Sequence, residues 1–117
     1  MIRALALLPL FLATGAARDP LAGRVAGPPV ECIQLSRRTA PEIVDGATIL
    51  YRESGRRTYR TGPAAACPGL RPRSPIVAEV HGRKLCRGDR FRVSYPPNGG
   101  ISTAFCRFGL FVPYDKS

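Results

Sequence analysis

The stretch from Cys67-Pro68-Gly69-Leu70 to Leu85-Cys86-Arg87-Gly88-Asp89 indicates the fold class of the chain. Its two cysteines stand at the two ends of a loop rich in proline and arginine. In residues 89–95, which follow, the apolar Phe91, Val93 and Tyr95 alternate with polar residues. Strict alternation is typical of a strand with one buried and one solvated face. The stretch therefore predicts a β domain that is held by disulfides.

The segments before this stretch predict further strands and turns. Asp45-Gly46 lies between the β-forming runs 42–44 and 47–52 and predicts a tight hairpin, because both residues tolerate positive φ. Ser54-Gly55 predicts a second turn that returns the chain along residues 57–60. Proline and glycine are dense in residues 62–75, so neither a helix nor a central strand is expected there.

The last segment, residues 103–112, is apolar on both faces apart from Arg107. A strand that is buried on both sides lies centrally in a sheet or closes a small barrel. No window of about 11 residues beyond the N-terminal region shows a helical period. We therefore expect an all-β domain of about six to eight short strands, stapled by disulfides and arranged as a meander or a small barrel.

Residues 1–17 are typical of a cleaved signal peptide. Arg3 provides the positive start, the apolar run 4–13 is too short to span a bilayer, and Gly15 and Ala17 suit a cleavage site. The expected organisation is a signal peptide over 1–17, a flexible linker over 18–30, a single β domain over 31–113 and a polar tail over 114–117. We expect no transmembrane segment in the mature chain.

The chain has four cysteines, all of them after the signal peptide. An even number in a short exported chain predicts two disulfides and an oxidising compartment, either the periplasm or the exterior. Four cysteines allow three pairings. We favour Cys67–Cys86, which would pin the proline-rich loop, and Cys32–Cys106, which would tie the first strand to the last. The cysteines are too widely spaced for a zinc site, so neither a metal nor a cofactor is expected.

Six short motifs follow one another along residues 32–113: Cys32-Ile33, Asp45 with Thr48-Ile49-Leu50, Tyr59-Arg60, Cys67-Pro68-Gly69-Leu70, Leu85-Cys86 with Asp89, and Cys106-Arg107-Phe108-Gly109-Leu110-Phe111. Their order resembles that of a group of small exported alphaproteobacterial proteins with a domain of unknown function. Members of that group often have two acidic residues in place of Asp45-Gly46 and an aliphatic residue in place of Phe108. The resemblance implies a periplasmic or secreted protein and implies no activity.

The formal charge of the chain is +10, and it falls to +9 when Arg3 leaves with the signal peptide. Such a charge favours binding to polyanions, although an arginine-rich surface also serves solubility. The best candidate for anion binding is the basic stretch Arg83, Lys84, Arg87, Arg90 and Arg92. Tyr51 and Tyr59 could add aromatic groups from a neighbouring strand. Nucleic acid is not the favoured partner, because no RNA-binding signature is present and exported proteins rarely meet nucleic acid.

His81 is the single histidine of the chain. It could form an acid–base pair with Glu79, two residues before it on the same strand face, as in a ribonuclease-like hydrolase. An exposed turn histidine fits the same pattern, and no serine lies in a nucleophile-elbow motif. Asp89 is interpreted as a structural residue that accepts a hydrogen bond from nearby backbone. We therefore select no catalytic residue.

The sequence favours a non-enzymatic binding or structural module of the cell envelope with a basic face. Its expected partner is an anionic envelope component or another envelope protein. Two alternatives stay open: a small secreted hydrolase centred on His81, and an inhibitor of a secreted enzyme that inserts the rigid proline-rich loop.

Overall fold

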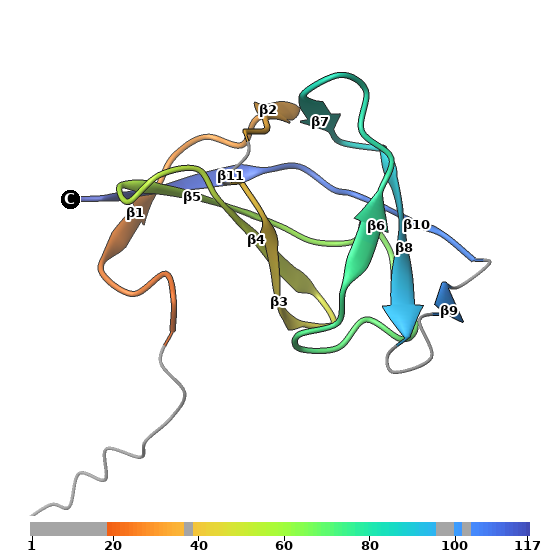
Figure 1. Ribbon diagram of the computed structural model, residues 1–117. Helices are drawn as coiled ribbons and strands as arrows, with labels where there is room; N and C mark the ends of the chain where they lie inside the picture. The colour runs from red at the N-terminus through yellow and green to blue at the C-terminus, as the bar shows by residue number, and fades with distance from the viewer. Residues whose placement is uncertain (1–18, 37–38, 96–99, 102–103) are drawn as a thin grey trace, which may run out of the picture.

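The computed structural model describes residues 19–36, 39–95, 100–101 and 104–117, which fold into strands, turns and loops (Figure 1). The expected all-β class is confirmed. The expected signal peptide, residues 1–17, lies outside the described residues. Within the described ranges there is no helix that could cross a membrane.

The described residues form eleven strands, more than the six to eight expected, because several strands have only two or three residues. They are β1 (Arg24–Ala26), β2 (Cys32–Gln34), β3 (Pro41–Asp45), β4 (Thr48–Arg52), β5 (Arg57–Thr61), β6 (Ile76–Ala78), β7 (Lys84–Cys86), β8 (Arg90–Tyr95), β9 (Gly100–Ile101), β10 (Cys106–Arg107) and β11 (Val112–Lys116).

All strand pairs are antiparallel. The largest sheet has five strands in the order β1-β11-β5-β4-β3, and a second sheet has the order β10-β8-β6 with β9 beside β8. Strands β2 and β7 form a separate pair. The hairpin at Asp45-Gly46 and the turn at Ser54-Gly55 are confirmed, since they connect β3 to β4 and β4 to β5. The Asp45 carboxylate accepts the Ala47 N–H at 2.8 Å and so stabilises the first turn.

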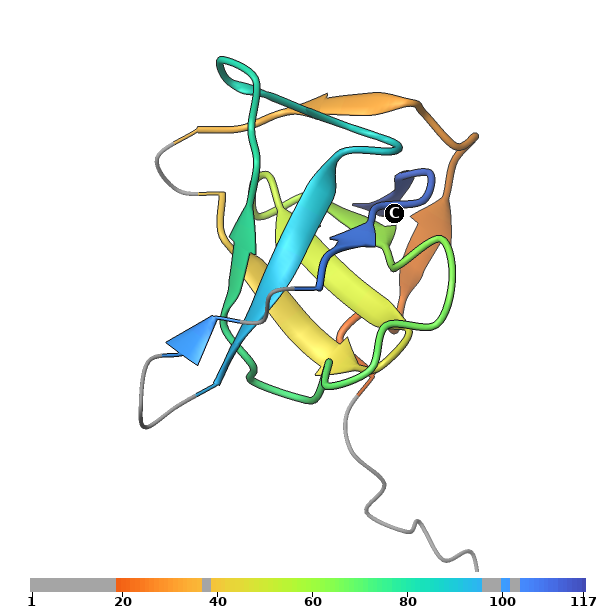
Figure 2. The same ribbon diagram turned by 90° about the vertical axis from the view of Figure 1, so that its right-hand side faces the viewer.

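Backbone hydrogen bonds join the two larger sheets into a barrel-like ring. After β5, the Ala64 N–H donates to the Arg107 carbonyl and the Gly109 N–H donates to the Gly62 carbonyl, both at 2.8 Å. On the other side, the Arg73 N–H donates to the Ile43 carbonyl of β3 at 3.2 Å. Figures 1 and 2 show β3, β4 and β5 on one side of the ring and β6 and β8 on the other.

Aromatic rings fill the space between the sheets. Phe91, Phe108 and Phe111 are fully buried, and the Phe108 ring lies 4.4 Å from that of Phe91 and 6.1 Å from that of Tyr51, measured between centroids. Burial of such a side chain contributes about 1.5–3 kcal/mol. Phe108 thus connects a strand of each sheet within one core.

The expected continuous strand over residues 103–112 is wrong. Strand β10 ends at Arg107, and the chain turns through Phe108–Phe111 before β11 begins. The segment turns because it pairs first with β8 and then with β5, which belong to different sheets. It is not buried on both sides either, since Phe105 is 42% and Leu110 38% exposed.

The expected bounds of the linker and of the tail are also wrong in part, because strands of the two segments pair with each other. Residues 24–26 of the expected linker form β1, and residues 114–116 of the expected tail belong to β11. Arg24 is paired with Lys116, and the Gly27 N–H donates to the Pro113 carbonyl at 2.8 Å. The domain therefore includes both of these segments.

All four cysteines form disulfides, but the favoured pairing is wrong. The bonds are Cys32–Cys86 and Cys67–Cys106. Cys32 lies directly opposite Cys86 in the β2–β7 pair, and Cys67 ties the proline-rich loop to β10. The bonds span 54 and 39 residues, for which chain entropy predicts about 4 kcal/mol of stabilisation each.

The disulfide pairing can be tested by peptide mapping of the oxidised protein without reduction. We expect one linked peptide pair to contain Cys32 and Cys86 and the other to contain Cys67 and Cys106. A linked pair of Cys67 and Cys86 would contradict the register of β2 and β7.

Gly62 allows the end of β5 to approach the β3–β4 turn. A Cβ at this position would overlap the Ala47 carbonyl oxygen, which is backbone and cannot easily move. We expect Gly62→Ala to lower the free energy of unfolding by about 1–3 kcal/mol, measured by urea denaturation. Gly55→Ala is the control, because a Cβ there meets nothing within 4 Å and should change stability by less than about 0.5 kcal/mol. Equal effects of the two changes would contradict this packing.

Candidate functional site

The predicted anion-binding residues lie in three places. Arg83 and Lys84 are exposed in the turn before β7 and at its start. Arg87 forms an ion pair with Glu31 at 3.1 Å. Arg90 and Arg92 alternate along β8 with the buried Phe91 and Val93, so their side chains point away from the core, as predicted.

The Arg90 guanidinium is held in place by two neighbours. Its Nε and Nη2 both donate to the Glu79 carboxylate, at 3.1 and 2.8 Å. Its Cζ lies 4.8 Å from the centroid of the Phe105 ring. The guanidinium of Arg107 approaches the same ring at 5.3 Å, while its Nη1 donates to the Gly88 carbonyl at 2.8 Å. An exposed aromatic ring is thus flanked by two arginines whose orientation is fixed.

Two further residues extend this surface. Val77 of β6 is paired with Arg92 and is 47% exposed. Among the described side chains, the Nε of Arg92 is a buried nitrogen without a hydrogen-bond partner. We call Val77, Arg90, Arg92, Phe105 and Arg107 the β8 face.

The aromatic member of this face differs from the expected ones. Tyr51 and Tyr59 lie in the core, 3% and 8% exposed, so the expectation that they join the arginines is wrong. Burial also raises the pKa of the Tyr51 hydroxyl above its ordinary value of 10.0. Phe105 takes their place. Sequence reasoning missed it because it assigned Phe105 to a strand buried on both sides.

A shallow hollow of about 270 Å³ adjoins the β8 face. It is lined by the three consecutive alanines Ala64–Ala66 together with Phe105, Cys106 and Arg107. The alanines are exposed, so this floor is apolar and open to a ligand. The face therefore combines apolar surface with fixed cations.

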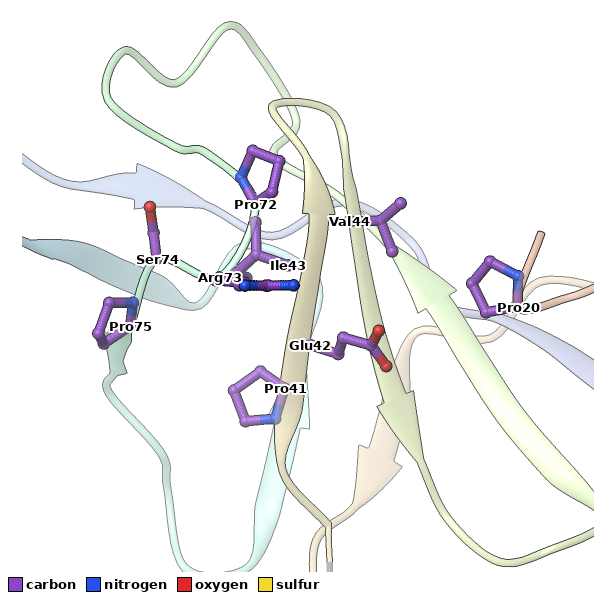
Figure 3. A pocket seen from close by; sticks show the side chains of 9 residues that line it. All are labelled: Pro20, Pro41, Glu42, Ile43, Val44, Pro72, Arg73, Ser74 and Pro75. Carbon is purple, nitrogen blue, oxygen red and sulfur yellow. The ribbon is translucent and has the colours of Figure 1, made fainter. Parts of the chain in front are cut away.

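A second hollow, of about 560 Å³, lies at the edge strand β3 (Figure 3). Pro72, Ser74 and Pro75 from the loop before β6 lie on the opposite side of β3 from Pro20 of the N-terminal segment. Prolines and a covering loop protect an edge strand from pairing with another chain. Four of its nine lining residues are prolines, and we interpret the hollow as edge protection.

The structure gives Glu79, the expected acid–base partner of His81, a different partner. His81 is exposed next to a tight turn, and the Glu79 carboxylate expected to assist it is bound to Arg90. The structural interpretation of Asp89 is confirmed, because its carboxylate accepts the Cys86 N–H at 2.7 Å. The described parts of the chain contain no group of three or more residues that could hold a metal ion.

The chain was compared with known proteins at the level of family, sequence and structure. No family model, curated protein or solved structure matches it. The resemblance to exported alphaproteobacterial proteins therefore stays a prediction. The function has to be inferred from the geometry and charge of the β8 face.

Carboxylates neutralise only part of the positive charge. Glu31, Glu79 and Asp115 form ion pairs, the last with Arg57 at 2.7 Å. Asp45 and Asp89 accept backbone N–H groups instead. Most cations of the described residues thus have no carboxylate within ion-pair distance. They leave the surface with a strong positive potential.

Asp115 reports on this potential. The hydrogen bond from Arg57 and the charges of Arg57, Arg24 and Arg56 lower the pKa of its carboxyl group below the ordinary value of 3.8. A carboxyl group whose pKa is lowered in the folded protein stabilises the fold at pH values above its ordinary pKa. This stabilisation is lost as the pH falls through the lowered pKa.

We therefore expect Asp115→Asn to lower the urea midpoint of unfolding at neutral pH and to have a smaller effect well below pH 3.8. The difference should also shrink in salt, because the pair is exposed. Glu53→Gln, which removes a carboxylate outside the three ion pairs, is the control and should leave the midpoint nearly unchanged. An Asp115→Asn effect that does not depend on pH would contradict the electrostatic explanation.

Proposed function

We propose that the protein is a non-enzymatic binding module of the cell envelope, periplasmic or secreted, that attaches to anionic lipid surfaces through the β8 face. The observation that carries the proposal is the exposed ring of Phe105 between the guanidinium groups of Arg90 and Arg107. The two disulfides suit a protein that matures in an oxidising compartment.

Attachment to a membrane surface needs apolar groups that enter the headgroup region and cations that meet the phosphates. Phe105 and Val77 supply the first, with 42% and 47% of their surface exposed. Arg92 and Arg107 supply the second and are free of ion pairs with the described carboxylates. A basic residue contributes about 1 kcal/mol near an anionic membrane.

Guanidinium groups suit a phosphate-bearing surface better than ammonium groups do. They bind phosphate oxygens with two parallel hydrogen bonds and are weakly hydrated. The Gly88 carbonyl holds one guanidinium nitrogen of Arg107, and Glu79 holds two nitrogens of Arg90. Their remaining N–H groups are oriented before the ligand arrives, which lowers the entropic cost of binding.

Co-sedimentation with vesicles tests the proposal. We expect the protein to bind vesicles of equimolar phosphatidylglycerol and phosphatidylcholine at about 0.15 M salt and to bind pure phosphatidylcholine weakly. The double variant Phe105→Ala/Arg107→Gln should bind the anionic vesicles about 10-fold more weakly or worse, since it loses one apolar anchor and one cation.

The matched control is Val25→Ala/Arg83→Gln, which removes an apolar side chain and a cation outside the β8 face. Val25 is 61% exposed in β1, and Arg83 is exposed before β7. Its binding should be close to that of the wild type. Equal losses of vesicle binding in the two double variants would contradict the assignment of the binding site to the β8 face. Retention on immobilised lipopolysaccharide with no binding to vesicles would show that the ligand is not a phospholipid surface.

A further inference from the structure

The outer surface of the five-stranded sheet carries a second set of cations. Tyr51, Tyr59 and Pro113 are paired across β4, β5 and β11, and the two tyrosines lie in the core. The residues that alternate with them point outward. The pairings Arg52↔Thr58, Leu50↔Arg60, Thr58↔Tyr114 and Arg24↔Lys116 place a row of basic residues on this side. We call Arg24, Arg52, Arg60, Tyr114 and Lys116 the β5 face.

The cations of the β5 face are not neutralised nearby. None of them belongs to the three ion pairs of the described residues. Arg24 and Arg60 donate instead to uncharged oxygens, the Arg56 carbonyl at 3.0 Å and the Tyr114 hydroxyl at 3.2 Å. The register adds Glu42 at the β3 edge. The face thus keeps a net positive charge.

The β5 and β8 faces point in opposite directions. Phe91 of β8 and Tyr51 of β4 both pack on Phe108, with ring centroids 4.4 and 6.1 Å away. Each face is the reverse side of a strand that lines this shared core. Figures 1 and 2 show the five-stranded sheet and β8 on opposite sides of the barrel. One flat surface therefore cannot contact both faces.

The two faces also differ in chemistry. The β8 face has exposed Phe105 and Val77 beside its arginines. On the β5 face, Leu50 is covered to 2% exposure, so this face offers guanidinium, ammonium and hydroxyl groups. Binding through the β5 face has to be electrostatic and is therefore weakened strongly by salt.

We propose that the β5 face binds a second anionic lipid surface, so that one molecule bridges two bilayers. This inference rests on the proposed function of the β8 face. Charge complementarity with phosphate headgroups supports the choice of an anionic lipid surface, because the face presents four basic residues outside the three described ion pairs and no large exposed apolar group. Bridging follows from the back-to-back placement of the two faces.

Turbidity of vesicles of equimolar phosphatidylglycerol and phosphatidylcholine measures bridging, and co-sedimentation of the same samples measures binding. We expect the wild-type protein to bind and to aggregate the vesicles. The double variant Arg52→Gln/Arg60→Gln should bind within about 3-fold of the wild type and cause little turbidity, because the β8 face remains intact. Raising the salt should abolish turbidity before it abolishes binding.

The matched control Arg71→Gln/Arg83→Gln removes the same charge from two exposed residues outside both faces and should aggregate vesicles like the wild type. Binding without aggregation by the wild type would overturn the bridging proposal and leave the proposed function standing. Failure to bind would overturn both. Aggregation by the Arg52→Gln/Arg60→Gln variant, or its loss in the control, would also overturn bridging through the β5 face. Urea midpoints of all variants verify that each is folded.

Discussion

The structure depends on the closure of the barrel between residues 62–64 and 107–109. Two backbone hydrogen bonds join the end of β5 to the end of β10 here, and the fully buried Phe108 lies between them in sequence. Without this junction the two sheets would share no backbone contact on this side, and β10, the edge strand of the second sheet, would be left unpaired on its outer side. The junction also gives the two faces their opposite directions, because it turns the chain from one sheet to the other. The closure of the barrel and the opposite directions of the β5 and β8 faces therefore both depend on this junction.

In a domain of this size the core leaves only a modest net stability, and the two disulfides add to it. Cys67–Cys106 lies beside the closing junction and holds the proline-rich loop against β10. Cys32–Cys86 holds together the β2–β7 pair, which lies outside the two larger sheets. Each bond thus secures a segment outside the two larger sheets, one the β2–β7 pair and the other the proline-rich loop.

Local sequence signals predicted the local structure well. Asp45-Gly46 and Ser54-Gly55 form turns that their residue types predict. The alternation around Phe91 and Val93 identifies the inward face of β8. Pairing between distant segments has no such signal. The β1–β11 pair, the disulfide partners and the corner at Phe108 each depend on segments far apart in sequence. The same holds for the residues of the β8 face. The outward direction of Arg90 and Arg92 can be predicted from the alternation of polar and apolar residues. Phe105 and Arg107 lie beside them only because β10 pairs with β8.

The late position of β11 in the chain has a consequence for folding. Strands β3, β4 and β5 occupy consecutive residues and can form a meander early, whereas the partner on the free side of β5 begins only at Val112. Until then the β5 edge is an open template on which a second molecule could add a strand. Charged side chains act as gatekeepers at such edges and disfavour self-association. Arg57 and Arg60 supply such charges on β5, and Asp115 of β11 pairs with Arg57 in the folded protein.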